Sequence, residues 1–372
     1  MKKFTVILLM ISIILTGCID KKDEEKEAFK DERTTISKDE ETMQKELSKN
    51  KKQKEVKSHN TYYFKKYDVE NGYRGEVILE AYDKDENVIW NKKWSNLVIT
   101  ELSLSSKLAV DDYNIYIGVY GTLYALNKET GEEVWHIENI GAISKPYINK
   151  DRIYVSGYYG PFLTCVDIHN GKQIWQYDSK DMYWSTTISK VDNKIAVEYE
   201  GADETKLALF NEDGNLISEN NGRLSENIIK WDRVVASSIL DSNYKRYGET
   251  NVLDGKSETA WVEGTKGYGI NEWVKMESNS YREINEIEIL NGYHKNIDTY
   301  ENNGKMKKFR LDFSNNEHMI YSVTGNNKQY YFSDIDIILA KPIHTDFIKL
   351  TILDVFEGKK YQDTCISEIT VK

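Results

Sequence analysis

The 372-residue chain has little of three residues that often carry structure or chemistry: three prolines, three cysteines and six histidines. Three cysteines cannot form the dense disulfide framework that stabilises small secreted domains. No histidine has a second histidine four residues away, as helical zinc sites do. Walker loops, dinucleotide-binding glycine patterns and Gly-x-Ser-x-Gly elbows do not occur either. We therefore expect a protein that is not an enzyme.

The chain has fewer positive than negative side chains, and helical hydrophobic periodicity is scarce after residue 60. The chain has 50 Lys+Arg against 61 Asp+Glu, which gives a formal net charge of -11. A protein this acidic is not attracted to nucleic acid or to anionic lipid headgroups. After residue 60, short runs of Val, Ile, Tyr and Trp alternate with clusters of Asn, Gly and Asp. This pattern predicts an all-β protein, and the length allows two or three domains.

The N-terminus carries an apolar run, Phe4–Leu15, preceded by two lysines. This run is shorter than the about 20 residues that a helix needs to span a bilayer, and it matches the core of a signal peptide. The segment Leu15–Cys18, LTGC, resembles the lipobox of bacterial lipoproteins. The resemblance implies cleavage before Cys18, a lipid with palmitate chains on that cysteine, and an extracytoplasmic location anchored to the cell membrane. The alternative is a secretory signal in which the cysteine is incidental.

Residues 18–59 differ in composition from everything that follows. Residues 19–58 hold twelve Lys/Arg and twelve Asp/Glu, with scarcely any large apolar side chain. Such a segment cannot bury enough apolar surface to offset the entropy lost on ordering. We predict a charged, disordered tether.

The next region repeats itself. Four segments share an alternating strand, a polar turn and a further apolar run: Val77–Trp90, Asn114–Trp135, Arg152–Trp175 and Asn193–Ile217. Gly131 and Gly171 are 40 residues apart, and the tryptophans that close the second and third copies have the same spacing. The fourth copy has no tryptophan. A period near 40 in an all-β sequence indicates β-propeller blades.

The segments TGEEVW and NGKQIW resemble the repeats of the PQQ-type propeller family, found in quinoprotein dehydrogenases and in outer-membrane assembly lipoproteins. The resemblance covers about residues 60–224. It implies a partial or small β-propeller, because about four blades are countable where the family usually has about eight. A PQQ enzyme would also need adjacent cysteines, which this chain lacks, so no PQQ is expected. The closure of the blades stays open at this point.

The two cysteines after Cys18 are predicted to be buried free thiols. Cys165 occupies the same position of the repeat as Ala125, which indicates a small core residue. Cys365 lies far from it in the sequence and in a different predicted domain.

Residues 225–372 show a different pattern of strands and motifs. The motifs are LDG at 253–255, TAWVEG at 259–264, GINEW at 269–273, NGYHKN at 291–296 and DTCISEI at 363–369. Together they resemble the discoidin or coagulation-factor C-domain superfamily and, within it, the NADase-type glycan-binding domain. The resemblance implies a jelly-roll β-sandwich that binds carbohydrate through loops at one end. It does not imply NAD hydrolysis.

Sugar binding needs an aromatic face and fixed polar groups around it. The candidates in the predicted loops are Tyr268, Trp273, Tyr293, His294 and Tyr361. The alternative is that the aromatic residues belong to the core, and for Trp261 we prefer that interpretation.

Related sandwich modules also imply a structural Ca²⁺, for which the matching residues are Asp254, Thr259 and Glu368. Two carboxylates, a hydroxyl and loop carbonyls suit this cation. The alternative is that Asp254 caps its own turn with Gly255 and that Glu368 pairs with a nearby base.

The leading hypothesis is a membrane-anchored, non-enzymatic surface lipoprotein. Its C-terminal sandwich would bind a cell-wall or surface glycan, with the propeller repeats as a platform. The alternative is a protein–protein adaptor or assembly factor that acts through the propeller. An enzyme on the propeller axis is a third and weaker possibility.

Overall fold

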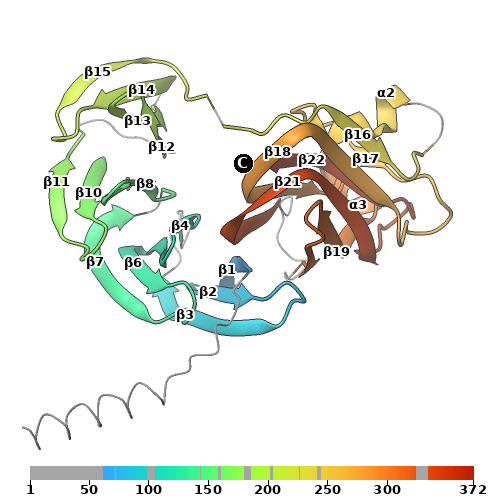
Figure 1. Cartoon of the computed structure of the whole chain (residues 1–372), viewed down its shortest axis with the longest axis horizontal. Helices are drawn as coiled ribbons and strands as arrows, with labels where there is room; N and C mark the ends of the chain where they lie inside the picture. The colour runs from blue at the N-terminus through green and yellow to red at the C-terminus, as the bar shows by residue number, and fades with distance from the viewer. Residues whose placement is uncertain are drawn as a thin grey trace, which may run out of the picture. The chain divides into compact units, whose positions relative to one another are not determined.

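The structure is a computed structural model that describes ten ranges: 62–71, 73–98, 105–142, 144–157, 161–179, 186–201, 204–225, 227–240, 244–323 and 334–372. Residues Ser58–Lys372 form one compact unit, and its described residues are drawn in colour in Figure 1. The predicted signal peptide, Cys18 and the tether lie outside the described residues. Within the described ranges, no helix is long and apolar enough to cross a membrane.

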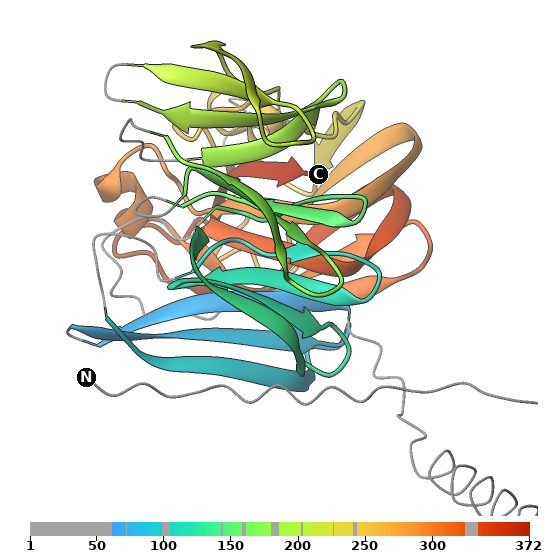
Figure 2. The ribbon, with the colours of Figure 1, turned by 90° about the vertical axis from the view of Figure 1, so that its left-hand side faces the viewer.

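Three of the sheets are four-stranded, antiparallel and built from consecutive strands (Figure 2). The first contains β4 (Ala109–Val110), β5 (Asn114–Val119), β6 (Gly121–Asn127) and β7 (Glu133–Ala142). The second contains β8 (Tyr147–Asn149), β9 (Arg152–Val155), β10 (Leu163–Asp167) and β11 (Gln173–Tyr177). The third contains β12 (Thr186–Val191), β13 (Lys194–Glu200), β14 (Thr205–Phe210) and β15 (Leu216–Asn221). The last three sequence repeats therefore each fold as one blade-like sheet, and the predicted all-β fold class is confirmed.

A tryptophan in the outer strand of one sheet contacts the next sheet, and the contact recurs three times. Each indole N–H donates to a main-chain carbonyl of the following repeat: Trp90 to Lys128 at 3.0 Å, Trp135 to Ile168 at 3.0 Å and Trp175 to Glu212 at 2.9 Å. Each ring also lies against the turn glycine of that repeat: Gly131, Gly171 and Gly214 respectively. The tryptophan of one repeat thus packs on the turn glycine of the next repeat, and this pair forms the contact between neighbouring sheets.

A small residue stands opposite each of these tryptophans. The cross-strand pairs are Ala81 with Trp90, Ala125 with Trp135 and Cys165 with Trp175. In the last sheet the corresponding pair is Leu209 with Ser218, so the side chain that would contact a further sheet is missing. Cys165 is fully buried and free, and burial raises the pKa of its thiol to about 11. Cys365 is buried and free too, as predicted.

The first repeat is joined to the C-terminal domain by strand pairing. Its strands are β1 (Tyr63–Asn71), β2 (Arg74–Tyr82) and β3 (Val88–Val98). They continue into the C-terminal sheet because β1 pairs with β21 (Asp334–Phe356), with Tyr63 opposite Leu339 and Phe64 opposite Ile338. Tyr63 belongs to the core of the C-terminal domain, whereas Phe64 belongs to the core between the first two repeats.

A buried lysine lies at this junction. Lys65 is 2% exposed, and its Nζ donates to Glu86 Oε1 at 2.7 Å and to the Ser322 carbonyl at 2.9 Å. The same Nζ lies 4.5 Å and 4.2 Å from the ring centroids of Tyr82 and Tyr321. Burial lowers the pKa of Lys65. For Glu86, hydrogen bonds from Lys65 and Ser322 outweigh burial, so its pKa lies below the ordinary value. Lys65 and Glu86 both hydrogen-bond to Ser322, so the pair links the first repeat to the C-terminal domain.

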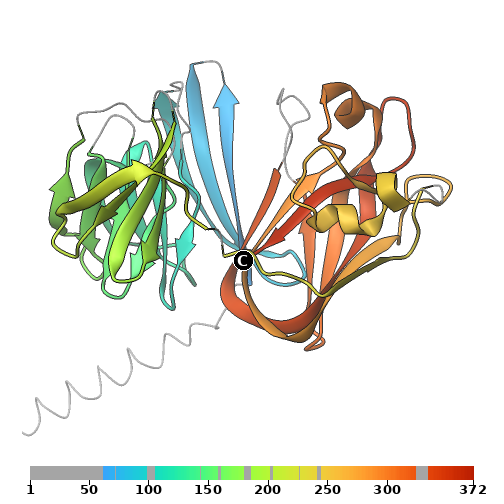
Figure 3. The same ribbon diagram turned by 90° about the horizontal axis from the view of Figure 1, so that it is seen from above.

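The C-terminal domain is a β-sandwich around a large apolar core. Its further strands are β16 (Arg233–Ala236), β17 (Trp261–Val262), β18 (Trp273–Asn291), β19 (Lys305–Phe313), β20 (His318–Ser322) and β22 (Cys365–Val371). Short helices α2 (Tyr244–Tyr247), η1 (Glu249–Leu253) and α3 (Ile297–Asn302) lie in its connections. The strands β18 and β21 pair along most of their length and bend together, as the orange and red ribbons of Figure 3 show.

Candidate functional site

Three loops meet at one end of the sandwich. They are residues 263–272 before β18, residues 292–304 after it, and residues 357–364 before β22. Hydrogen bonds of 2.8 Å join them: Thr364 Oγ1 donates to the Tyr268 carbonyl, and Gly304 N donates to the Asp363 carbonyl. These three loops together are named the loop end, and contacts between segments about sixty to a hundred residues apart hold them in place.

A buried carboxylate organises the first of these loops. Glu263 is fully buried, and its oxygens accept the N–H of Thr265 at 2.8 Å and the N–H of Thr364 at 3.2 Å. Burial raises its pKa. Gly269 has a φ of +67°, and a Cβ there would lie 2.5 Å from the Glu263 side chain. A glycine at 269 is therefore required both by the backbone and by the carboxylate.

Two of the predicted aromatic candidates reach the surface of the loop end. Tyr361 is 45% exposed, and Lys360 Nζ lies 5.0 Å from its ring centroid. Tyr268 is partly exposed, and burial together with a hydrogen bond to Glu357 raises the pKa of its hydroxyl. Gln362, the neighbour of Tyr361, also contacts the Tyr268 hydroxyl. The loops thus bring Tyr268 and Tyr361 to one place.

The other three candidates lie at the start of β18 and in the loop 292–304. Trp273 is half-buried at the start of β18, with Lys349 Nζ 4.6 Å from its ring centroid. Tyr293 packs on a small apolar cluster, and burial raises the pKa of its hydroxyl. His294 is 6% exposed, and its Nε2 lies 3.2 Å from the Asn291 carbonyl. His294 is therefore buried, whereas Trp273 and Tyr293 are partly exposed, as Tyr268 is.

The imidazole of His294 is held in an apolar setting. Its ring meets the edge of Tyr300 at 5.2 Å between centroids. Burial lowers its pKa to about 4, and the nearby Lys305 charge acts in the same direction. Trp261 is fully buried and donates its indole N–H to the Ser238 carbonyl, as the structural interpretation predicted.

The three residues expected to hold Ca²⁺ lie together. Both carboxylate oxygens of Asp254 accept the Thr259 hydroxyl at 2.9 Å, and Asp254 also caps its own turn through Lys256 N at 3.0 Å. Glu368 accepts Gly255 N at 3.1 Å. Burial and the Asp254 charge raise the pKa of Glu368 to about 7.

This donor set fits a hard cation, since it offers two carboxylates, a hydroxyl and loop carbonyls. In the part of the chain that the structure describes, Glu368 forms no ion pair with a base. Over the same ranges, no group of three or more His, Cys, Asp or Glu side chains is placed to hold a metal. Main-chain and hydroxyl oxygens would have to complete the coordination.

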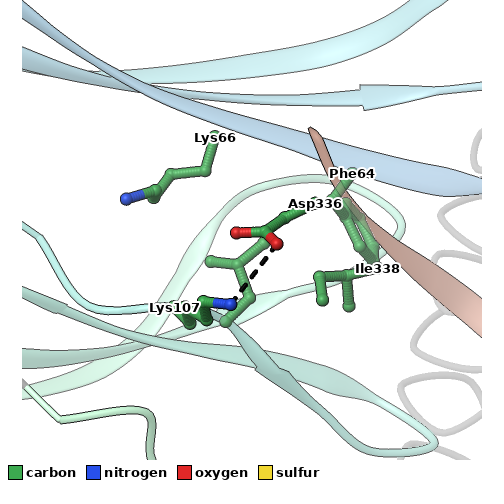
Figure 4. Close-up of a pocket in the computed structure, with 6 residues that line it drawn as sticks. Phe64, Lys66, Lys107, Asp336 and Ile338 are labelled. Atoms are coloured by element: carbon green, nitrogen blue, oxygen red, sulfur yellow. Dashed lines mark hydrogen bonds and ion pairs between the residues drawn. The ribbon is translucent and has the colours of Figure 1, made fainter. Parts of the chain in front are cut away.

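A small pocket lies where the repeats meet the C-terminal domain (Figure 4). It has a volume of about 30 Å³, and Lys107, Asp336 and Ile338 are among its lining residues. A site of that size holds a water molecule or two but no organic ligand. Lys107 Nζ pairs with Glu288 at 2.5 Å and with Asp336 at 3.3 Å, so the pocket belongs to an ion-pair network of the junction.

Comparison with known families agrees with this architecture. The family model described as "outer membrane protein assembly factor BamB" matches residues 74–285, which is more than half of the chain. The chain belongs to this family. A second family model, described as "NAD glycohydrolase translocation F5/8 type C domain", matches residues 225–372. Residues 225–372 of this BamB-family chain therefore match a discoidin-like domain, and the resemblances of the repeats and of the C-terminal motifs are confirmed.

Several solved structures are similar to the C-terminal domain. One is the family 32 CBM from C. perfringens NanJ in complex with galactose, at 18% identity and a TM-score of 0.28 over 37% of this chain and 91% of that chain. Another is the CBM32 of AlyQ in complex with 4,5-unsaturated mannuronic acid, at 15% identity and a TM-score of 0.28 over 40% of this chain and 98% of that chain. No curated protein matches the chain significantly.

Proposed function

We propose that the chain is a non-enzymatic surface lipoprotein, held on the cell membrane by lipid on Cys18, that binds carbohydrate at the loop end of its C-terminal domain. The observation that carries the proposal is the placement of Tyr268 and Tyr361 on loops that hydrogen bonds fix in position. The match of residues 225–372 to an F5/8 type C domain supports it. The LTGC segment supports the anchor.

The chemistry of the loop end suits a sugar. An aromatic ring offers a flat apolar face to the C–H surface of a pyranose, and polar groups around it orient the hydroxyls. Lys360 and Gln362 flank Tyr361 and supply such groups. The hydrogen bond from Thr364 N to Glu263 joins the loops 263–272 and 357–364. Because these loops are already ordered, little entropy is lost when a ligand binds.

The test is a glycan array probed with the full-length chain in a detergent without a sugar headgroup, followed by titration calorimetry on each hit. Tyr268→Ala and Tyr361→Ala should each weaken binding about ten-fold while the melting temperature stays unchanged. Tyr73→Ala removes another exposed tyrosine, 91% exposed in the β1–β2 turn, and should leave binding unchanged. A well-folded chain that binds no glycan on the array would contradict the proposal.

A second candidate function is a protein–protein adaptor acting through the repeats. Tyr113 and Tyr120, 75% and 50% exposed, lie at the two ends of β5, and exposed tyrosines are enriched in protein interfaces. Photo-crosslinking from each position in cells would test it. The crosslinking residue replaces Tyr120 in one chain. A protein captured there that is displaced by an excess of wild-type chain, but not by an excess of Tyr120→Ala chain, would favour the adaptor. No defined crosslink from either position would count against it.

We also propose a structural Ca²⁺ at Asp254, Thr259 and Glu368. When bound, the cation would neutralise the two carboxylates. The side chains of this site would then fasten the loop after η1 to β22, because Asp254 lies at the end of η1 and Glu368 lies on β22.

A further inference from the structure

A second, larger pocket opens on the sandwich where β18 and β21 bend. It has a volume of about 520 Å³, which is within the range of ligand sites. The strand β18 starts directly after the loop 263–272 and ends directly before the loop 292–304, so its middle lies at the end of the sandwich away from both loops. The lining residues are Asp232, Arg233, Lys275, Glu277, Ser278, Asn279, Tyr281, Ser314, Asp346 and Phe347.

A large bulge forms one wall of this pocket. Glu277 pairs with Phe347 and Arg282 pairs with Thr345, so the segment 278–281 stands opposite Asp346 alone. Bulges of this kind redirect side chains and often lie beside functional sites. Here the bulge leaves Tyr281 67% exposed.

Hydrogen bonds fix both walls. Asp232 Oδ2 accepts Asn279 N at 2.8 Å and the Ser278 hydroxyl at 3.2 Å, which holds the bulge. On the other side, Asp346 N donates to Ser314 Oγ at 3.1 Å. The pocket is therefore a formed feature of the sandwich and does not need to be assembled by a ligand.

Among the described residues, the cations of the pocket form ion pairs, whereas one of its carboxylates does not. Glu277 pairs with Lys275 at 2.6 Å and with Arg233 at 3.5 Å, so the cations are already engaged. Within the described part of the chain, the carboxylate of Asp346 and the hydroxyl of Tyr281 have no hydrogen-bond or ion-pair partner. An ionised carboxylate only accepts hydrogen bonds, so the Asp346 side of the pocket favours a ligand with hydrogen-bond donors.

We propose that this pocket is a second carbohydrate site, which takes a neutral saccharide unit. The ring of Tyr281 packs on the apolar face of the sugar, and the Asp346 carboxylate accepts two hydroxyl hydrogens. The Asn279 side chain contributes a donor and an acceptor from the bulge. Anionic sugars are disfavoured because Asp232 and Asp346 face the same space. An apolar ligand is disfavoured because most of the lining is polar.

This inference goes beyond the function proposed above, because it assigns a site that shares no residue with the loop end. The test therefore starts from a Tyr268→Ala/Tyr361→Ala chain, in which the loop end is disabled. The full-length chain in a sugar-free detergent is examined by saturation-transfer NMR. The probes are the methyl β-glycosides of galactose, glucose and N-acetylglucosamine, with galacturonic acid as the anionic comparison.

At least one neutral glycoside should receive saturation from this chain, and galacturonic acid should receive none. Adding Tyr281→Ala or Asp346→Asn should each weaken that binding about ten-fold. For Asp346→Asn this is the loss of a hydrogen bond to a charged group, and for Tyr281→Ala it is the loss of the ring that packs on the sugar. Adding Tyr73→Ala should change nothing.

Two results would overturn the proposal: no saturation of any neutral probe, or saturation that survives both pocket substitutions. Failure of the loop end gives a different result. In that case wild-type and Tyr268→Ala/Tyr361→Ala chains would bind equally, while the pocket substitutions would still remove the signal.

Discussion

The repeated contact between tryptophan and glycine can be tested by adding a single methyl group. Gly131 has a φ of +70°, and a Cβ there would lie 2.5 Å from Cε3 of Trp90. That ring is nearly buried and held by its hydrogen bond to the Lys128 carbonyl. It cannot move aside without breaking this bond. Gly131→Ala therefore carries two costs, a left-handed backbone and an overpacked contact.

Gly121→Ala provides the matched control. Its φ is +80°, but the nearest atom to a Cβ lies at 3.7 Å, an ordinary contact distance. The control should lose only the left-handed cost of about 1–2 kcal/mol. Gly131→Ala should lose a further 1–3 kcal/mol, roughly, from overpacking. With about 2.1 cal/mol/K of unfolding entropy per residue, the further loss lowers the melting temperature of the Ser58–Lys372 unit by about 1.5–5 °C.

The assay is thermal unfolding of the full-length chain, followed by circular dichroism. Trp90→Ala supplies the second arm, because in its background Gly131→Ala should cost no more than Gly121→Ala does. The coupling between the two substitutions should then be about 1–3 kcal/mol. Equal losses for Gly121→Ala and Gly131→Ala, or a coupling of zero, would refute the reasoning.

Four further outcomes are expected. Cys18→Ala should move the full-length chain from the detergent phase to the aqueous phase in cloud-point partitioning, and an unchanged distribution would exclude lipid on this cysteine. Lys65→Met should cost about 3–5 kcal/mol in urea unfolding because it takes the close Lys65 charge from the Glu86 carboxylate and leaves only the longer pair with Lys308 at 3.5 Å, and Lys65→Met/Glu86→Gln should recover much of the loss. His294 has a folded pKa near 4 against an unfolded 6.5. The unfolded chain binds the extra proton between these values, so stability falls by up to about 3 kcal/mol as pH drops from 6.5 to 4, and His294→Gln should flatten that profile. Ca²⁺ should raise the melting temperature of the wild-type chain but not of Glu368→Gln, and a wild-type melting temperature indifferent to a chelator would exclude the cation.

The repeat region was readable from the sequence because its contacts are periodic. Gly131 and Gly171, and the tryptophans 40 residues apart, mark positions where one sheet meets the next. The equivalence of Ala125 and Cys165 predicted a small buried residue, and the structure shows why: each stands opposite a tryptophan. The motifs of the C-terminal domain were equally informative about fold, since they gave the family that its model match confirms.

The candidate sites were harder to predict. Tyr268, Tyr293 and Tyr361 have the same residue type in similar loops, but only contacts between loops decide how much of each ring reaches solvent. His294 was a glycan-binding candidate because it lies in a predicted loop, yet the edge of Tyr300 and the Asn291 carbonyl enclose it. The pocket beside Tyr281 gave no signal in the sequence, because its two walls come from strands more than sixty residues apart.

The sequence by itself determined the all-β class, the repeat period, the buried cysteines and the family of each half, because all of these depend on periodicity or on short local motifs. Tertiary structure alone decided how the halves join. Tyr63 and Leu339 pair although their positions differ by 276 residues, and the Lys65 ammonium lies over the rings of Tyr82 and Tyr321. Strand register and burial of this kind depend on which surfaces exclude water from each other, and no local pattern encodes that choice.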